Sequence, residues 1–211
     1  LEILTHMWHS EKVFNMNRLF LILVLTLSFQ SIAKADDISD FEIEGISLGD
    51  SLLDHYNRDN IGLEMSSGRP FWYKDNKYIA IGLFEIEKSH KIFDGVGVAI
   101  KPNDHNLYKI YSIYGKLYFE NKPIEDCYKK QKNISKEISD TYSRIIIEKD
   151  EWSVSTERLR DHLVSQNYID LILNEGKMRI ACYERKSGNH LLQVVINGKE
   201  FQDFLTKNNN K

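Results

Sequence analysis

The most regular hydrophobic pattern in the chain lies between Lys122 and Ile147, where apolar residues recur at steps of three and four. This spacing places them on one side of an α-helix and leaves the lysines between them elsewhere. Pro123 suits the first helical turn, and acidic residues just after it favour the positive end of the helix dipole. The sequence therefore predicts one amphipathic helix over residues 122–147. Its buried side comprises Ile124, Cys127, Tyr128, Gln131, Ile134, Ile138, Tyr142 and Ile145.

Alternation of apolar and polar residues, typical of β-strands, flanks this helix on both sides. The separating segments are short and rich in turn residues, which favours antiparallel meanders over βαβ crossovers. We expect an α+β fold: an antiparallel sheet of about six strands in two three-stranded meanders, packed by two or three helices. The alternating runs span 78–87, 95–101, 108–119, 169–173, 178–182 and 192–196.

The remaining segments have weaker patterns. Glycines at 45 and 49 predict a turn that opens a short helix carrying Leu52, Leu53 and Tyr56. Residues 57–77 are polar, with turn signals, and predict a loop. Its aromatic cluster at 71–73 is either a flap packed on the sheet edge or an exposed binding platform. Residues 149–166 fit a short helix or an edge strand equally well.

Residues 16–35 have the pattern of a cleaved signal peptide. A short basic start at Met16 precedes an apolar run from Leu19 to Phe29, and Ala33 and Ala35 form an A-x-A cleavage site. The run is about half the roughly 20 residues that a membrane span needs. We expect residues 1–15 to be a non-native upstream extension and residues 36–211 to be a single exported domain. Its halves, 36–120 and 121–211, share the order of their elements.

Export predicts a periplasmic or secreted protein without a membrane anchor after processing, because no cysteine near the cleavage site can carry a lipid. The formal net charge of the whole chain is −3, and no concentrated basic face is visible in the sequence. Nucleic-acid binding, which needs such a face, is therefore not expected.

Both cysteines, Cys127 and Cys182, follow the expected cleavage site, in a compartment where disulfides persist. Cys127 lies on the apolar side of the predicted helix, and Cys182 alternates with Met178 and Ile180 on a predicted strand. This arrangement predicts a disulfide between them, with two buried thiols as the alternative. Their separation does not fit a C-x-x-C redox motif, and two thiols without neighbouring histidines make no zinc site.

Three segments carry a family resemblance: 41–54 (FEIEGISLGDSLLD), 126–131 (DCYKKQ) and 181–183 (ACY). In them the chain resembles a group of uncharacterised small exported proteins of marine alphaproteobacteria. A weaker similarity is to envelope modules of the outer-membrane lipoprotein SmpA type and the β-lactamase-inhibitor-protein type, in which a turn opens the first helix before an antiparallel sheet. The chain lacks the lipid-bearing cysteine of the former. The resemblance implies export and the cysteine pair, and no activity.

Catalytic and metal-binding motifs are not apparent. The chain has no G-x-S-x-G sequence, and its acidic clusters do not match a calcium loop. No two histidines of the expected exported domain have helix-face spacing, so we expect no catalytic residue, metal or cofactor. The histidines of the expected exported domain are His55, His90, His105, His162 and His190.

Tyrosine is the most informative residue type, with eleven in the chain. In the run 108–119, simple alternation places Tyr111, Ile113, Leu117 and Phe119 on the face covered by the predicted helix. The opposite face is then aromatic and partly exposed, which suits contact with a protein or a glycan. This possible interaction face comprises Tyr108, Tyr114, Lys116 and Tyr118.

These patterns predict an exported binding or protein-interaction module whose partner is an envelope protein or a glycan. The alternative is a small secreted hydrolase with a site assembled from scattered acids and histidines. A hydrolase requires a concave pocket in which at least two such groups converge.

Overall fold

The computed structural model describes residues 37–83, 92–142, 145–153 and 163–209 of the 211-residue chain. Residues 36–211 form one compact unit. The predicted signal peptide, with Ala33 and Ala35, lies outside the described residues.

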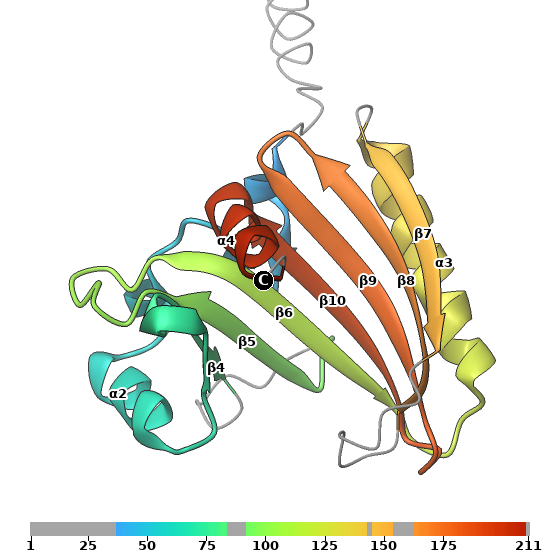
Figure 1. The fold of residues 1–211 in the computed structure, drawn as a ribbon, viewed down its shortest axis with the longest axis horizontal. Coiled ribbons are helices and arrows are strands. Elements are labelled where there is room, and N and C mark those ends of the chain that lie inside the picture. The colour runs from blue at the N-terminus through green and yellow to red at the C-terminus, as the bar shows by residue number, and fades with distance from the viewer. Residues whose placement is uncertain (1–36, 84–91, 143–144, 154–162, 210–211) are drawn as a thin grey trace, which may run out of the picture. The chain divides into compact units, whose positions relative to one another are not determined.

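The unit is built on an antiparallel eight-stranded sheet (Figure 1). A separate two-stranded hairpin, β1 (Glu42–Ile43) with β2 (Ile46–Ser47), precedes it. The two predicted meanders join in this sheet, because β6 pairs with β10 along eight residues. In spatial order the strands are β3 (Phe71–Trp72), β4 (Ile79–Gly82), β5 (Gly95–Ile100), β6 (Ile110–Phe119), β10 (His190–Gly198), β9 (Gly176–Arg185), β8 (Leu163–Leu173) and β7 (Ile146–Ser153).

The α+β class is confirmed, but the predicted number of six strands is wrong. The two additional strands, β3 and β7, are the edges of the sheet. β3 is two residues long, too short for alternation to be visible. β7 begins at Ile146, inside the range predicted as helix, because a run of three isoleucines favours extended backbone.

The central helix is α3, Ile124–Thr141, shorter than the predicted range. Its backbone turns extended at Tyr142, which bonds back to the Ile138 carbonyl. The segment 57–77, predicted as a loop, instead holds α2 (Arg58–Ser66), capped by the Asn57 side chain. A polar helix of this kind has no apolar period to reveal it. The remaining helices are η1 (Ile38–Asp40), η2 (Leu52–Asp54), η3 (Lys74–Asn76) and α4 (Lys199–Asn209).

α3 and the N-terminal elements cover one face of the sheet, and α4 lies on the other (Figure 1). The first face carries the main core, in which Ile180, Cys182 and Leu192 pack with the apolar side of α3. Gln131 of α3 is buried there and donates from its amide to the backbone carbonyls of Asn167 and Ile180, at 3.0 and 2.7 Å. A polar side chain at this apolar position therefore fixes the helix to two strands.

The predicted disulfide is present and joins Cys127 of α3 to Cys182 of β9, with both cysteines fully buried. It closes a loop with a sequence separation of 55 residues. The helix is thereby tied covalently to the sheet face on which it packs.

α4 packs on the second face through a smaller aromatic cluster. Phe201 and Phe204 contact the ring of Tyr78, each with ring centroids 4.9 Å apart. α4 lies against β6, β10 and β9 on this face, and its phenylalanines pack with Ala99 of β5. The rest of this face carries no helix among the described residues, and it contains the candidate site.

Candidate functional site

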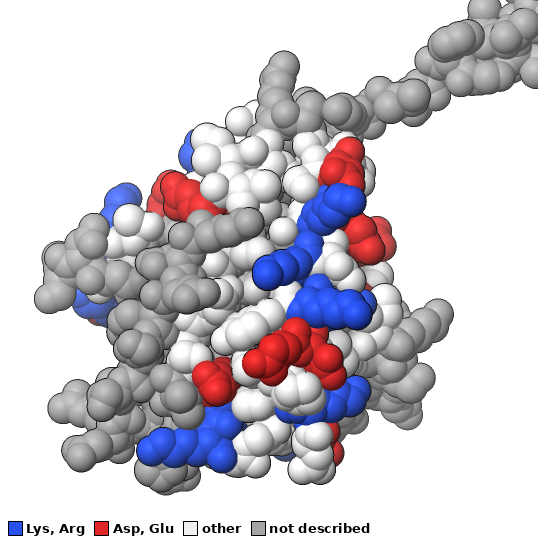
Figure 2. Space-filling view, turned by 90° about the vertical axis from the view of Figure 1, so that its right-hand side faces the viewer, with Lys and Arg blue, Asp and Glu red and all other residues white. Residues whose placement is uncertain are grey.

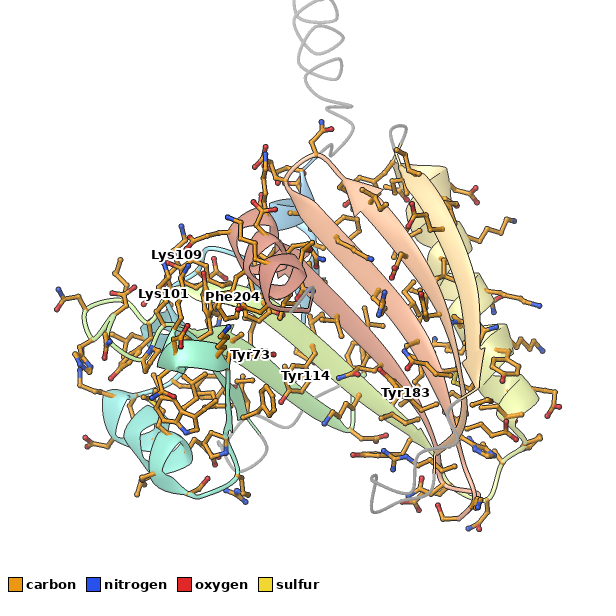
Figure 3. All side chains as sticks on the ribbon, viewed as in Figure 1. Tyr73, Lys101, Lys109, Tyr114, Tyr183 and Phe204 are labelled. Carbon is orange, nitrogen blue, oxygen red and sulfur yellow. A yellow bond between two sulfur atoms is a disulfide. The ribbon has the colours of Figure 1, made fainter. Side chains whose placement is uncertain are left out.

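Half-buried aromatic and cationic side chains gather on the part of the second face that α4 leaves open. They come from β6 and β9, at positions that alternate with the buried core residues. We call this group the tyrosine face. It comprises Tyr114, Lys116, Tyr118, Arg179, Tyr183 and Arg185. Figure 3 shows Tyr114 and Tyr183 in a row with Tyr73, below α4.

Tyr114 is held in place by a glycine on the neighbouring strand. Gly97 of β5 is its cross-strand partner, and a Cβ at that position would lie 2.1 Å from the Tyr114 ring. The ring therefore fills the space that a side chain at 97 would take. Burial, with smaller contributions from Tyr73 and Tyr118, raises the pKa of Tyr114 to about 12. Its hydroxyl is thus a neutral group that can donate a hydrogen bond.

Cations lie over the aromatic rings of this surface. Lys116 Nζ is 5.1 Å from the Tyr114 ring centroid, and the Arg179 guanidinium is 4.0 Å from that of Tyr168. Burial lowers the pKa of Lys116, and the charge of Arg185 lowers it further. Half-buried aromatic rings beside cations are the composition found at the energetic centres of protein interfaces.

Three of the four residues predicted to form the interaction face, Tyr114, Lys116 and Tyr118, lie together on the second face of the sheet. Tyr108 does not. Tyr108 precedes β6 with a positive φ of 45° and is buried in the main core, with Arg58 over its ring. Its hydroxyl lies 3.3 Å from His105 Nδ1.

Tyr111 lies on the second face, in the α4 cluster with Tyr78, and not on the α3 face where simple alternation placed it. The β5–β6 register shifts between Ala99 and Ile100. This β-bulge adds one residue to β6 before Ser112 and so reverses the alternation for every earlier position. Sequence alternation cannot reveal a bulge, whereas it assigned the positions after Ser112 correctly.

The aromatic cluster at 71–73 is divided between packing and exposure. Tyr73 stands edge-on to Phe201 of α4, with ring centroids 5.1 Å apart. Phe71 and Trp72 form the edge strand β3 and are 63% and 45% exposed. Phe71 is opposite Ala80 in the ladder and contacts the Tyr73 ring, so it lies on the same side of the sheet as the tyrosine face.

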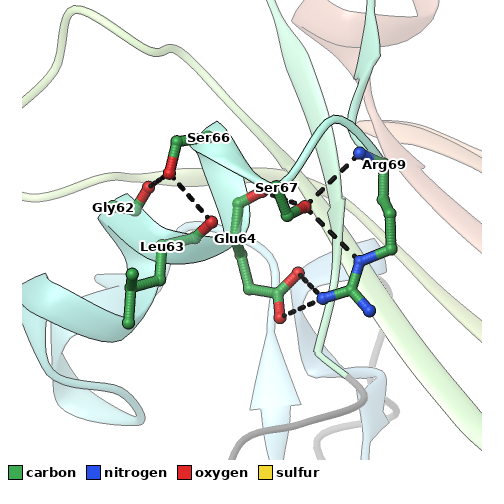
Figure 4. A network of polar contacts seen from close by, with 6 residues as sticks. All are labelled: Gly62, Leu63, Glu64, Ser66, Ser67 and Arg69. Carbon is green, nitrogen blue, oxygen red and sulfur yellow. Dashed lines mark hydrogen bonds and ion pairs between the residues drawn. The ribbon is translucent and has the colours of Figure 1, made fainter.

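The end of α2 that precedes β3 is fixed by a polar network (Figure 4). Arg69 donates to both carboxylate oxygens of Glu64, at 3.1 and 3.3 Å, and Glu64 is buried. The Ser67 hydroxyl donates to the Glu64 carbonyl and accepts from the Arg69 backbone N–H. These contacts hold the chain that leads to the exposed aromatics, and they leave no unsatisfied carboxylate for chemistry.

Acidic side chains converge in a pocket of about 330 Å³ between η1 and the start of α4. Asp37, Glu175 and Glu200 line it, together with Lys109 and Lys199. The hydrogen bond from Lys101, at 2.8 Å, lowers the pKa of Glu200, burial opposes this, and a hydrogen bond from the Tyr78 hydroxyl adds to it. Glu200 therefore stays ionised at neutral pH and cannot serve as a general acid.

We expect the Glu200 contacts to stabilise the docking of α4 in a pH-dependent way. Folding lowers the pKa of Glu200. The ionised carboxylate therefore stabilises the fold at pH values above the ordinary pKa of glutamate, and this stabilisation is lost as the pH falls through the lowered pKa. Half-exposed pairs contribute about 0.5–1 kcal/mol, so Glu200→Gln should lower the melting temperature by about 1–4 °C at pH 7. The difference should shrink steadily as the pH is lowered from 7 into the acid range. Melting curves of both proteins along this series test it, with exposed Glu137→Gln of α3 as the control; a difference that does not depend on pH would contradict the assignment.

None of the described histidines lines the acidic pocket. His55 Nε2 lies 3.3 Å from an Asp50 carboxylate oxygen, but neither residue lines the acidic pocket. His190 is buried and accepts from the Arg185 backbone N–H. His90 and His162 lie outside the described residues. Among the described residues no group of three His, Cys, Asp or Glu side chains could hold a metal ion.

The surface at the right of Figure 1 is shown in Figure 2, where Lys and Arg side chains alternate with Asp and Glu. This view shows no large area of one charge. Within the described part of the chain, no helix has the length and apolar character needed to cross a membrane.

No family model matches the chain, and neither a curated protein nor a solved structure is significantly similar to it. A function for this chain therefore has to be inferred from its fold and its surface geometry.

Proposed function

We propose that the protein is an exported binding module that holds a protein partner of the cell envelope against its tyrosine face. The observation that carries the proposal is the open half of the second sheet face, where Tyr114, Lys116 and Tyr118 stand half-buried beside Arg179 and Tyr183. Ile113, Ile180 and Cys182, which are core residues of the same strands, are fully buried, and the tyrosine rings lie on the opposite face of the sheet.

The chemistry of this surface favours a protein partner. Tyrosine and arginine are enriched at the centres of protein interfaces, and rings fixed by packing lose little conformational freedom on binding. Tyr114 is fixed in this way over Gly97. Exposed Phe71 extends the apolar surface to the β3 edge. A glycan, which also stacks on tyrosine, is the other ligand that a capture experiment would reveal.

Capture from envelope extract tests the proposal, with the purified oxidised protein as bait. We expect a stoichiometric protein partner that is lost when Tyr114→Ala and Tyr118→Ala are combined. The matched control is Tyr128→Ala with Lys132→Ala, two substitutions on α3 at the other side of the sheet. Melting curves confirm that both variants are folded.

Equal retention of the partner by the tyrosine-face variant would overturn the proposal. Retention of polysaccharide without protein would replace the protein partner by a glycan. Capture that fails in the α3 control instead would show that the partner binds the opposite side of the sheet.

A hydrolase is the second candidate, and the pocket lined by Asp37, Glu175 and Glu200 is the observation that favours it. A glycosidase pairs one ionised carboxylate with a second carboxyl group that holds a proton. Glu200 suits the first role, because its pKa is lowered by Lys101. Glycosidase activity that is lost in Glu175→Gln and retained in Glu137→Gln would support this candidate.

A further inference from the structure

A groove of about 300 Å³ runs between α4 and the β9–β10 part of the sheet. Of the described residues that line it, the two with charged side chains are Lys177 and Arg179, both cationic. Its apolar wall comes from Tyr183, Val195 and Leu205. A cavity of this volume is at the lower end of the range for small-molecule sites.

The two cations of the groove share one buried counter-ion. Arg179 makes two parallel bonds to the Asp170 carboxylate, at 2.7 and 2.8 Å, and Lys177 Nζ lies 2.5 Å from the same carboxylate. The Asp170 side chain is 2% exposed, whereas those of Lys177 and Arg179 are 21% and 36% exposed. The group therefore presents one net positive charge to the groove, and its carboxylate is shielded from any ligand.

This arrangement is rigid before any ligand arrives. The Arg179 guanidinium is held by Asp170 on one edge and by the Tyr168 ring on its face, at 4.0 Å. Its bonds to Asp170 use Nε and one terminal nitrogen, so the other terminal nitrogen keeps two donors. A guanidinium whose geometry is already fixed binds a carboxylate or phosphate with a small loss of conformational entropy.

The wall formed by α4 and β10 adds neutral polar groups. The Asn197 amide donates to the Gln202 oxygen at 3.2 Å, which leaves the Gln202 NH₂ group as the end that can donate to a ligand. The Thr206 hydroxyl donates to the Gln202 carbonyl and so has an oxygen that can accept. A hydrogen-bond donor beside two cations favours an anionic ligand. The Thr206 hydroxyl oxygen can accept a hydrogen bond from a polar substituent elsewhere on that ligand.

We infer that the α4 groove binds a small anionic ligand, a carboxylate or phosphate ester with a compact body. The negative group contacts Lys177 and Arg179, and the body packs against Tyr183 and Leu205. This site adjoins the proposed partner surface and shares Arg179 and Tyr183 with it. Its test uses the purified protein and small anions without a protein partner, so either proposal can fail alone.

Titration of the ¹⁵N-labelled protein with benzoate, its neutral isostere benzamide, and phenyl phosphate tests the inference by NMR. We expect saturable shifts of β9 and α4 amide resonances with benzoate or phenyl phosphate and none with benzamide. The stronger of the two anions identifies the carboxylate or the phosphate source. Lys177→Gln keeps the Arg179–Asp170 pair and should weaken binding about tenfold, as expected for a lost charge-assisted bond.

Gln202→Glu provides a second variant that leaves the buried ion pair untouched and should abolish binding by adding a negative charge to the groove. Exposed Lys132→Gln on α3 makes the same charge change as Lys177→Gln and should bind normally. The inference is overturned if benzamide shifts the same resonances, if both groove variants bind as the native protein does, or if neither anion binds at concentrations on the order of 10 mM.

Discussion

Replacing both cysteines by alanine is expected to lower the free energy of unfolding by about 4 kcal/mol, a larger effect than we expect from any single substitution. The Cys127–Cys182 bond closes a 55-residue loop, and opening it returns that loop's entropy to the unfolded chain. For a domain of this size the loss corresponds to a melting temperature lower by about 8–16 °C. Denaturant unfolding of the oxidised native protein and of the double variant measures the difference.

Reductant supplies the internal control for this prediction. It should bring the native protein close to the stability of the double variant and leave the double variant unchanged. A native protein that loses less than about 1 kcal/mol on reduction would show that packing of α3, and not the covalent link, holds the helix on the sheet.

Asp170→Ala is expected to destabilise the protein by about 3 kcal/mol. Asp170 is buried in β8 and forms ion pairs with Arg179 and Lys177 on the neighbouring strand. Its removal leaves two cations close together without a counter-ion, a change that costs more than the loss of an exposed pair. Denaturant unfolding at pH 7 measures the effect.

Asp140→Ala is the matched control, because Asp140 forms an exposed pair with Lys136 on α3, with a separation of 4.0 Å and side chains that are 68% and 78% exposed. We expect its effect to stay within about 0.5 kcal/mol. Equal effects at 170 and 140 would contradict the assignment of a buried charge cluster.

The elements that were predicted correctly have apolar residues at a regular period along one buried side. The apolar side of α3 and the alternation in β9 and β10 both face the main core, so apolar residues recur along these elements at the period of a helix or a strand. The disulfide followed from the same patterns, because they placed Cys127 and Cys182 on the surfaces that meet. Gln131 belonged to the predicted buried side although it is polar, and its role, two bonds to strand carbonyls, depends on tertiary contacts.

The missed elements lack such a period. α2 carries apolar residues on different sides, with Ile61 buried and Leu63 exposed, and β3 is two residues long. β7 shares its first residues with the predicted helix, where three isoleucines suit either state until the chain finds a strand to pair with. β7 pairs with β8 over eight residues, and this pairing outweighs the helical spacing.

The candidate site was partly predictable. Alternation after the bulge placed Tyr114, Lys116 and Tyr118 together, whereas Tyr108 and Tyr111 lie before Ser112, where the register has shifted. The contribution of β9, Arg179 and Tyr183, could not be found from sequence. It depends on the pairing of β10 with both β6 and β9, which joins the two meanders.

Oxidative footprinting of tyrosines, with and without envelope extract, tests most directly whether the open sheet face is the binding surface. On addition of extract, the modification rates of Tyr114, Tyr118 and Tyr183 should fall. Those of Tyr128 and Tyr142, on the α3 side, should not change. Protection of Tyr128 and Tyr142 alone, or no protection at any of the five tyrosines, would contradict the account.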